Sequence, residues 1–120
     1  MGTDARATLE VMQPPAGHAA PLRWAEFTLL RDYVLFDLIA GARAEDPTLA
    51  VVPIRPFAWR AGGEVDPATT ELSADDLAVV DAAYQARTGR RSAQLAALRA
   101  AMQAFEADGA GATRLRIWFF

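Results

Sequence analysis

The first hydrophobic pattern in the chain is an alternation over Ala7–Met12, where Leu9 and Val11 alternate with Thr8, Glu10 and Met12. A period of two predicts a short β-strand. The following residues, 13–21, contain prolines and a glycine and predict a loop.

Residues 22–43 contain no proline and are too long for one strand, so we predict a helix that ends near Gly41. A helical wheel gives this segment two apolar stripes. One contains Phe27, Val34 and Leu38, and the other contains Leu22, Leu29, Tyr33 and Phe36. A surface helix normally has a single apolar stripe. Two stripes predict that this helix is covered twice, by the sheet and by either another helix or a second subunit.

Residues 49–59 are rich in β-branched and aromatic side chains and predict a second strand. Pro53 and Pro56 cannot donate ladder hydrogen bonds, so this strand should lie at a sheet edge or end near Val52. Residues 60–72 contain two glycines and Asp66-Pro67, and predict a loop.

The start of the next helix carries a capping signature. Ser73 is expected at the N-cap and Asp76 three residues later, a shortened form of the capping box. Leu72 and Leu77 flank this cap at the positions of a hydrophobic staple. We expect the helix to end near Arg87.

A second helix should follow after a tight joint. Gly89 fits the C′ position of the first helix, and Ser92 can cap a helix over residues 93–107. Its apolar seam contains Leu95, Leu98, Met102 and Phe105. The two segments predict an αα-hairpin.

The chain ends on a strand pattern, TRLRIWFF. Leu115, Ile117 and Phe119 share one face. The other face carries Arg114, Arg116, Trp118 and Phe120. Because this segment is so apolar, we expect it to lie inside the sheet, beside the first or second strand. Glu10 would then lie opposite Arg114 or Arg116 as a cross-strand pair. The aromatic residues on the face away from the helices then need a cover, supplied by a partner, a second subunit or the N-terminal loop.

These elements predict one domain over residues 1–120 with the order β-α-β-α-α-β. The expected fold class is α+β, with two layers: a small three-stranded sheet packed on three helices. A chain of 120 residues can bury one real core without disulfides or metals.

Composition excludes several chemistries. The chain has no cysteine, lysine or asparagine, and all 12 of its basic residues are arginine. Disulfides, zinc–cysteine sites, Schiff bases and P-loops are therefore excluded. Abundant alanine and arginine indicate a GC-rich genome of bacterial type. The net charge of −3 argues against a nucleic-acid partner. No apolar run reaches the length of a membrane span and no signal peptide is visible, so the expected location is the cytoplasm, without a membrane partner.

The polar residues form no recognisable catalytic set. His18 is the single histidine and lies in a predicted loop, and both Ser73 and Ser92 are assigned to caps. Six acidic residues lie between Glu64 and Asp81, at spacings that match no EF-hand, and they favour solvation and helix capping over a metal site. A third interpretation is an acidic face that meets a basic partner. Arg87, Arg90, Arg91 and Arg99 form an opposite, basic pole, without the interleaved aromatics typical of base stacking. We expect no cofactor and no metal.

We therefore expect a non-catalytic interaction domain that binds a protein partner and self-associates as a homodimer. Immunity proteins and secretion chaperones are analogous only as classes. The predicted interaction surface contains Trp118, Phe120, Arg114 and Arg116. The alternative is a small-molecule-binding protein or enzyme, with a pocket between the long helix and the sheet that is lined by Trp24, Tyr33, Trp59, Trp118, Arg31 and Asp37.

Overall fold

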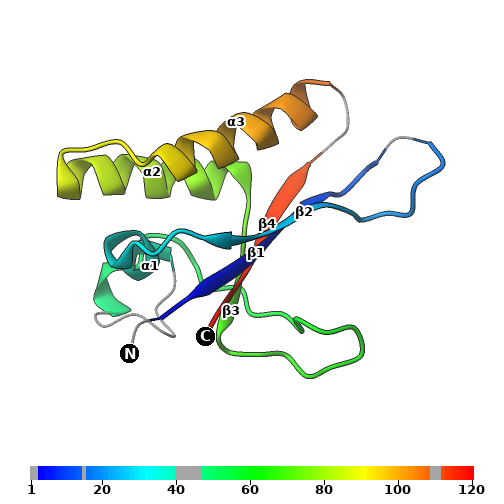
Figure 1. Ribbon diagram of the computed structural model, residues 1–120, viewed down its shortest axis with the longest axis horizontal. Coiled ribbons are helices and arrows are strands. Elements are labelled where there is room, and N and C mark those ends of the chain that lie inside the picture. Colours follow the sequence, from blue (N-terminus) through cyan, green and yellow to red (C-terminus); the bar gives the residue numbers. More distant parts are fainter. Residues whose placement is uncertain (1–2, 15, 40–46, 109–111) are drawn as a thin grey trace.

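The computed structural model describes residues 3–14, 16–39, 47–108 and 112–120, and Figure 1 shows their arrangement. The fold is α+β, as predicted. Its four-stranded antiparallel sheet has the order β2-β1-β4-β3. The strands are β1 (Ala5–Val11), β2 (Leu22–Leu29), β3 (Thr69–Leu72) and β4 (Thr113–Phe119). The helices are α1 (Tyr33–Ile39), the 3-10 turn η1 (Pro47–Leu49), α2 (Ala74–Thr88) and α3 (Ala93–Ala107).

The C-terminal strand β4 lies inside the sheet, as its apolar pattern predicts. It pairs with β1 on one side and β3 on the other. Leu115, Ile117 and Phe119 are at most 1% exposed. The pairing continues to the last residue, because Asp4 and Phe120 exchange backbone hydrogen bonds of 2.8 and 2.9 Å. Two ladders therefore hold the aromatic end of the chain and keep it from fraying.

The helix predicted over residues 22–43 is wrong, since residues 22–29 form edge strand β2 and only Tyr33–Ile39 form helix α1. A β-bulge places Trp24 as an extra residue in β2, between the partners of Leu9 and Glu10 on β1. The bulge interrupts the period of two that identifies a strand. The turn between the elements contains Asp32, whose Oδ1 accepts a hydrogen bond of 3.3 Å from the Leu35 N–H and caps α1. The predicted end near Gly41 lies outside the described residues.

The strand predicted over residues 49–59 is also wrong, although its expected position at a sheet edge is correct. The backbone there runs beside β3, with a hydrogen bond of 3.1 Å from the Glu71 N–H to the Arg55 carbonyl. The Arg55 N–H donates to Thr70 Oγ1 at 3.0 Å, and the Phe57 N–H donates to Thr69 Oγ1 at 2.8 Å. Threonine hydroxyls thus replace ladder carbonyls where the prolines prevent regular pairing.

Strand β3 itself was predicted as loop, so the sheet has four strands where three were expected. Its four residues, TTEL, are too few for a visible alternation. Their pairing is decided by β4, because Thr70 and Leu72 lie opposite Ile117 and Leu115 on the helix-covered face. Burial of this face therefore selects a strand that the local sequence does not indicate.

The αα-hairpin is confirmed. Ser73 Oγ accepts from the Asp76 N–H at 3.1 Å, while the Asp76 carboxylate accepts from the Ser73 N–H at 2.9 Å. Gly89 has a φ of 68°, the left-handed C-terminal position that glycine tolerates without strain. Ser92 Oγ accepts from the Leu95 N–H at 3.3 Å and caps α3.

Helices α1, α2 and α3 cover one face of the sheet, and the loop before β3 lies on the opposite side (Figure 1). The core between the layers contains Leu9, Leu35, Phe36, Ile39, Leu72, Leu77, Val80, Leu95, Met102, Leu115, Ile117 and Phe119. Among the described residues, no helix is long and apolar enough to cross a lipid bilayer.

Candidate functional site

The face of the sheet turned away from the helices, here called the far face, carries a network of four charged residues. Arg114 lies 2.6 Å from Glu10, which confirms the predicted cross-strand pair, and Arg116 lies 2.6 Å from Glu71. Longer contacts of 3.6 and 3.8 Å join Arg114 to Glu71 and Arg116 to Glu10. The network is neutral and only partly exposed. Arg114 and Arg116, both predicted as interaction residues, are therefore engaged within the chain.

A row of four aromatic side chains, Phe57, Trp59, Trp118 and Phe120, extends from this network and is called the aromatic row. Successive ring centroids are 5.9, 5.8 and 4.9 Å apart. The row passes from buried Phe57 to Phe120, which is 45% exposed. The Arg116 guanidinium lies 4.3 Å from the centroid of the Phe57 ring, in cation–π geometry. The chain's own residues 57–59 thus supply part of the cover that the sequence requires over Trp118.

A hollow of about 280 Å³ lies against the two tryptophans, and its lining contains Trp59, Arg60, Gly63, Glu64, Asp66 and Trp118. Its outer wall is a turn in which the Gly63 N–H donates to the Arg60 carbonyl at 2.9 Å. Gly62 has a φ of 74°, so this turn depends on glycine. Asp66 closes the loop, because its N–H donates to the Phe57 carbonyl at 3.0 Å and its Oδ1 accepts from the Ala68 N–H at 2.8 Å.

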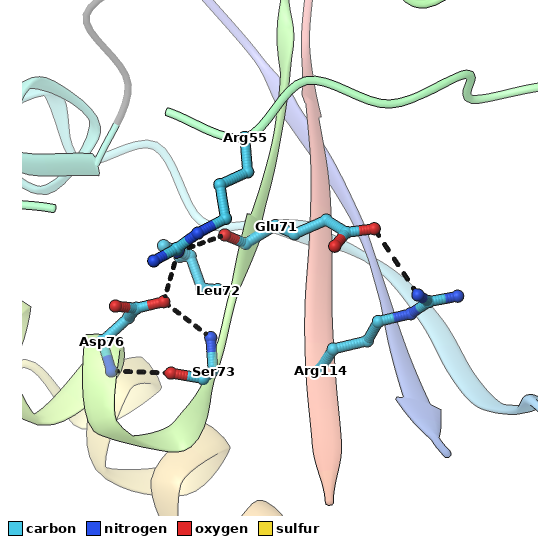
Figure 2. Close-up of a pocket in the computed structure, with 6 residues that line it drawn as sticks. All are labelled: Arg55, Glu71, Leu72, Ser73, Asp76 and Arg114. Carbon is cyan, nitrogen blue, oxygen red and sulfur yellow. Dashed lines mark hydrogen bonds and ion pairs between the residues drawn. The ribbon is translucent and has the colours of Figure 1, made fainter. Parts of the chain in front are cut away.

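A smaller hollow of about 170 Å³ lies where β3 meets α2, and Figure 2 shows its polar lining. Arg55 donates to Asp76 at 2.7 Å and to the Glu71 carbonyl at 3.4 Å. Asp76 also accepts from Ser73 in the capping box. The polar groups of this hollow bind one another. Their contacts attach the segment at Arg55 to the N-terminus of α2.

A third hollow, of about 240 Å³, lies at the joint between α2 and α3 and includes Arg90 and Arg91 of the basic pole. Tyr84 on its wall donates a hydrogen bond of 2.5 Å to Asp32. This bond, together with burial, raises the pKa of the Tyr84 hydroxyl above its ordinary value. Arg99 lies apart, in a 2.8 Å ion pair with buried Asp81. The four arginines of the basic pole are therefore not gathered at one place.

The residues of the alternative pocket do not all come together at one place, because the long helix that would form one wall is absent. Trp24 packs on Phe105 of α3, with ring centroids 5.0 Å apart, and Trp59 lies on the far face beside Trp118. Arg31 binds Asp4 at 2.6 Å. Tyr33 and Asp37 both lie on α1. His18 is exposed in the loop between β1 and β2.

Half of the acidic run between Glu64 and Asp81 is paired with arginine. Glu71, Asp76 and Asp81 bind Arg116, Arg55 and Arg99 respectively. Within the described part of the chain, Glu64 has no ion-pair partner. The same holds for the side chain of Asp66, whose one hydrogen bond is to a backbone amide.

Sequence reasoning did not assign Phe57, Glu64 or Asp66 to the interaction surface. Phe57 and Trp59 alternate around Ala58 as Trp118 and Phe120 alternate around Phe119, which is a weak signal of a shared face. The pattern does not reveal that residues 57–66 fold over the far face, because that depends on contacts with β3 and β4.

Comparisons with protein-family models, with curated proteins and with solved structures find no match to this chain. The functional argument therefore rests on the geometry of the far face, where a partly exposed aromatic row meets a hollow lined by unpaired acidic residues.

Proposed function

We propose that this chain is a non-catalytic binding protein that docks a partner protein on the far face of its sheet. The observation that carries the proposal is the aromatic row, which is buried at Phe57 and open at Trp118 and Phe120. Tryptophan, tyrosine and phenylalanine are enriched in the buried centres of protein interfaces. They supply large apolar area with little rotamer entropy to lose.

In the charge network the arginines are already paired within the chain, which leaves the aromatic side chains as the groups available to contact a partner. Arg114 and Arg116 are held by Glu10 and Glu71, and Arg116 also stacks on Phe57. This bracing fixes the surface beneath Trp118 before a partner arrives. A preorganised surface loses less entropy on association. In this proposal the arginines position the row, and the row makes the contact.

The proposal is for a different protein and not a second copy of this chain. Each copy carries a net charge of −3. Two copies joined through this face would bring Glu64 and Asp66 toward an equally acidic molecule. The unpaired carboxylates beside the row favour a partner with a basic surface. Homodimerisation is thus an outcome that the experiment must separate from partner binding.

Site-directed photo-crosslinking tests this proposal, and the absence of cysteine makes labelling unambiguous. Phe120→Cys places a benzophenone maleimide at the open end of the row. Val79→Cys, at a residue 49% exposed on α2, is the matched control position. Each labelled protein is irradiated in an extract of the producing organism, and adducts are identified by mass spectrometry.

We expect an adduct from position 120 that is absent from position 79. Excess unlabelled wild-type protein should abolish this adduct, whereas folded Trp118→Ala protein should not. Equal adducts at both positions, or none at position 120, would contradict docking on the far face. An adduct of two copies of this chain would replace the proposed partner by self-association.

A further inference from the structure

The hollow beside Trp59 and Trp118 combines two kinds of group that attract cations. Its aromatic wall consists of two indoles whose centroids are 5.8 Å apart and whose planes differ by 34°. Glu64 and Asp66 are also among the residues that line it. Tryptophan is the best of the aromatic residues for cation–π contact. A cation in this hollow would lie among two indoles and two acidic residues.

The carboxylates of this hollow differ from the others on the far face. Glu10, Glu26 and Glu71 each bind at least one arginine of the same chain. Within the described residues, neither Glu64 nor Asp66 pairs with a cation. Arg60 at the rim supplies one positive charge against these two negative charges. The hollow therefore has an excess of one negative charge.

Resting on the proposed function, we infer that this hollow binds the guanidinium group of an arginine side chain that the partner protein supplies. A volume of about 280 Å³ admits a guanidinium head with part of its aliphatic stem. The same face already holds such a contact, since Arg116 stacks on Phe57 at 4.3 Å. A planar guanidinium can stack on an indole and donate in its own plane to a carboxylate. An ammonium group is not planar, so it cannot stack flat on an indole while it donates to a carboxylate in the same plane.

The experiment uses tryptophan indole N–H signals in two-dimensional NMR of the full chain. The chain has three tryptophans. Trp59 and Trp118 line the hollow, and Trp24 lies against Phe105 as an internal reference. The probe is N-acetyl-arginine-N-methylamide, and the matched control is the same compound with citrulline, which is neutral and nearly isosteric. Ionic strength is held constant throughout.

We expect the Trp59 and Trp118 signals to shift saturably with the arginine probe, while the Trp24 signal stays in place and citrulline has no effect. Glu64→Gln should weaken binding by up to about fivefold, as for an exposed ion pair. Trp118→Ala should weaken it by about two- to thirtyfold. Asp75→Asn, at an exposed carboxylate outside the hollow, should leave binding unchanged. Equal shifts with citrulline, or no shifts at Trp59 and Trp118, would overturn the inference.

The two proposals fail separately. If photo-crosslinking identifies a partner at position 120 but the arginine probe does not bind, the docking surface stands and the guanidinium inference is wrong. If the probe binds but no position-dependent adduct forms, the hollow binds guanidinium groups, and the proposal that a partner protein supplies the guanidinium is wrong. Where photo-crosslinking identifies a partner and the arginine probe also binds, substitution of the partner's arginines gives a direct check. One of these substitutions should remove most of the affinity between the two proteins.

Discussion

Individual side chains in this protein often serve two contacts at once. The Asp76 carboxylate caps α2 by accepting from the Ser73 N–H and also binds Arg55 at 2.7 Å. Arg116 binds Glu71 and stacks on Phe57. Such residues couple local structure to tertiary structure, because a substitution removes both contacts together. Among the described residues, the Ser73 hydroxyl, by contrast, makes only the capping bond to the Asp76 N–H.

The first residue-scale prediction concerns Ser73→Ala. Loss of its bond to the Asp76 N–H should lower the free energy of unfolding by about 0.5–2 kcal/mol. Urea denaturation measures the change. The control is Gln103→Ala on the exposed side of α3, which should stay within about 0.5 kcal/mol of wild type. An unchanged midpoint for Ser73→Ala would show that this cap contributes nothing to stability.

The second concerns Tyr84, whose hydroxyl donates to the Asp32 carboxylate at 2.5 Å. Tyr84→Phe should cost about 1.5–3 kcal/mol, as for a hydrogen bond to a charged group. Tyr33→Phe, at a residue 46% exposed, is the matched control and should cost less than about 0.5 kcal/mol.

The raised pKa of Tyr84 gives an independent readout. In a Tyr33→Phe background, alkaline absorbance titration should show Tyr84 ionising above the ordinary tyrosine value of about 10. Because the folded-state pKa is raised, the associated stability is present below pH ~10 and is lost as pH rises through the folded pKa. Ionisation of Tyr84 at the ordinary value would contradict the bond to Asp32.

At the scale of elements, β4 separates stability from recognition by its two faces. Phe119 is 1% exposed and packs edge-to-face on Phe36, with centroids 5.4 Å apart. Trp118, the adjacent residue, is only partly buried and stacks on Trp59 and Phe120. A single strand thus contributes one face to the core and the other to the proposed docking surface.

Paired substitutions in β4 test this division. Phe119→Ala should lower the free energy of unfolding by about 3–5 kcal/mol, because it leaves a cavity in the core. Trp118→Ala should cost about 1–2 kcal/mol, mainly through lost aromatic contacts. Thermal or urea unfolding of both variants measures the difference. Equal losses of unfolding free energy for the two substitutions would show that the far face contributes as much to stability as the helix-covered face does.

At the scale of the whole molecule, surface ion pairs join segments that are distant in sequence. Arg31 binds Asp4, near the point where the two ends of the described chain pair, and Arg6 on β1 binds Glu26 on β2. The hydrogen bond from Arg31 holds the pKa of Asp4 below its ordinary value, and that from Arg6 does the same for Glu26. Both carboxylates are exposed at the molecular surface, so each pair contributes modestly.

These lowered pKa values predict a loss of stability in acid. The contribution is present above the unfolded-state values near pH 4 and is lost as pH falls through the lower folded-state values. Denaturant midpoints between about pH 5 and pH 2.5 should therefore fall less steeply in Asp4→Asn/Glu26→Gln than in wild type. Salt at 1 M should reduce the difference, since it screens exposed pairs. Parallel curves for the two proteins would contradict the contribution of these pairs.

The elements that could be predicted from the sequence are those whose signals are local. The caps at Ser73 and Ser92, the glycine at position 89 and the alternation of β4 all act within a few residues, so α2, α3, β4 and the α+β class were predictable. The pairing of Glu10 with Arg114 followed once β4 was placed beside β1.

Strands β2 and β3 and the far face depend on tertiary contacts. The bulge at Trp24 is defined by its partner strand, and the four residues of β3 become a strand because β4 offers them a buried edge. The hollow likewise forms only where residues 59–66 meet Trp118. Such contacts join residues that are distant in the sequence, and at these positions burial and strand pairing outweigh local propensity. A pattern of neighbouring residues carries no information about them.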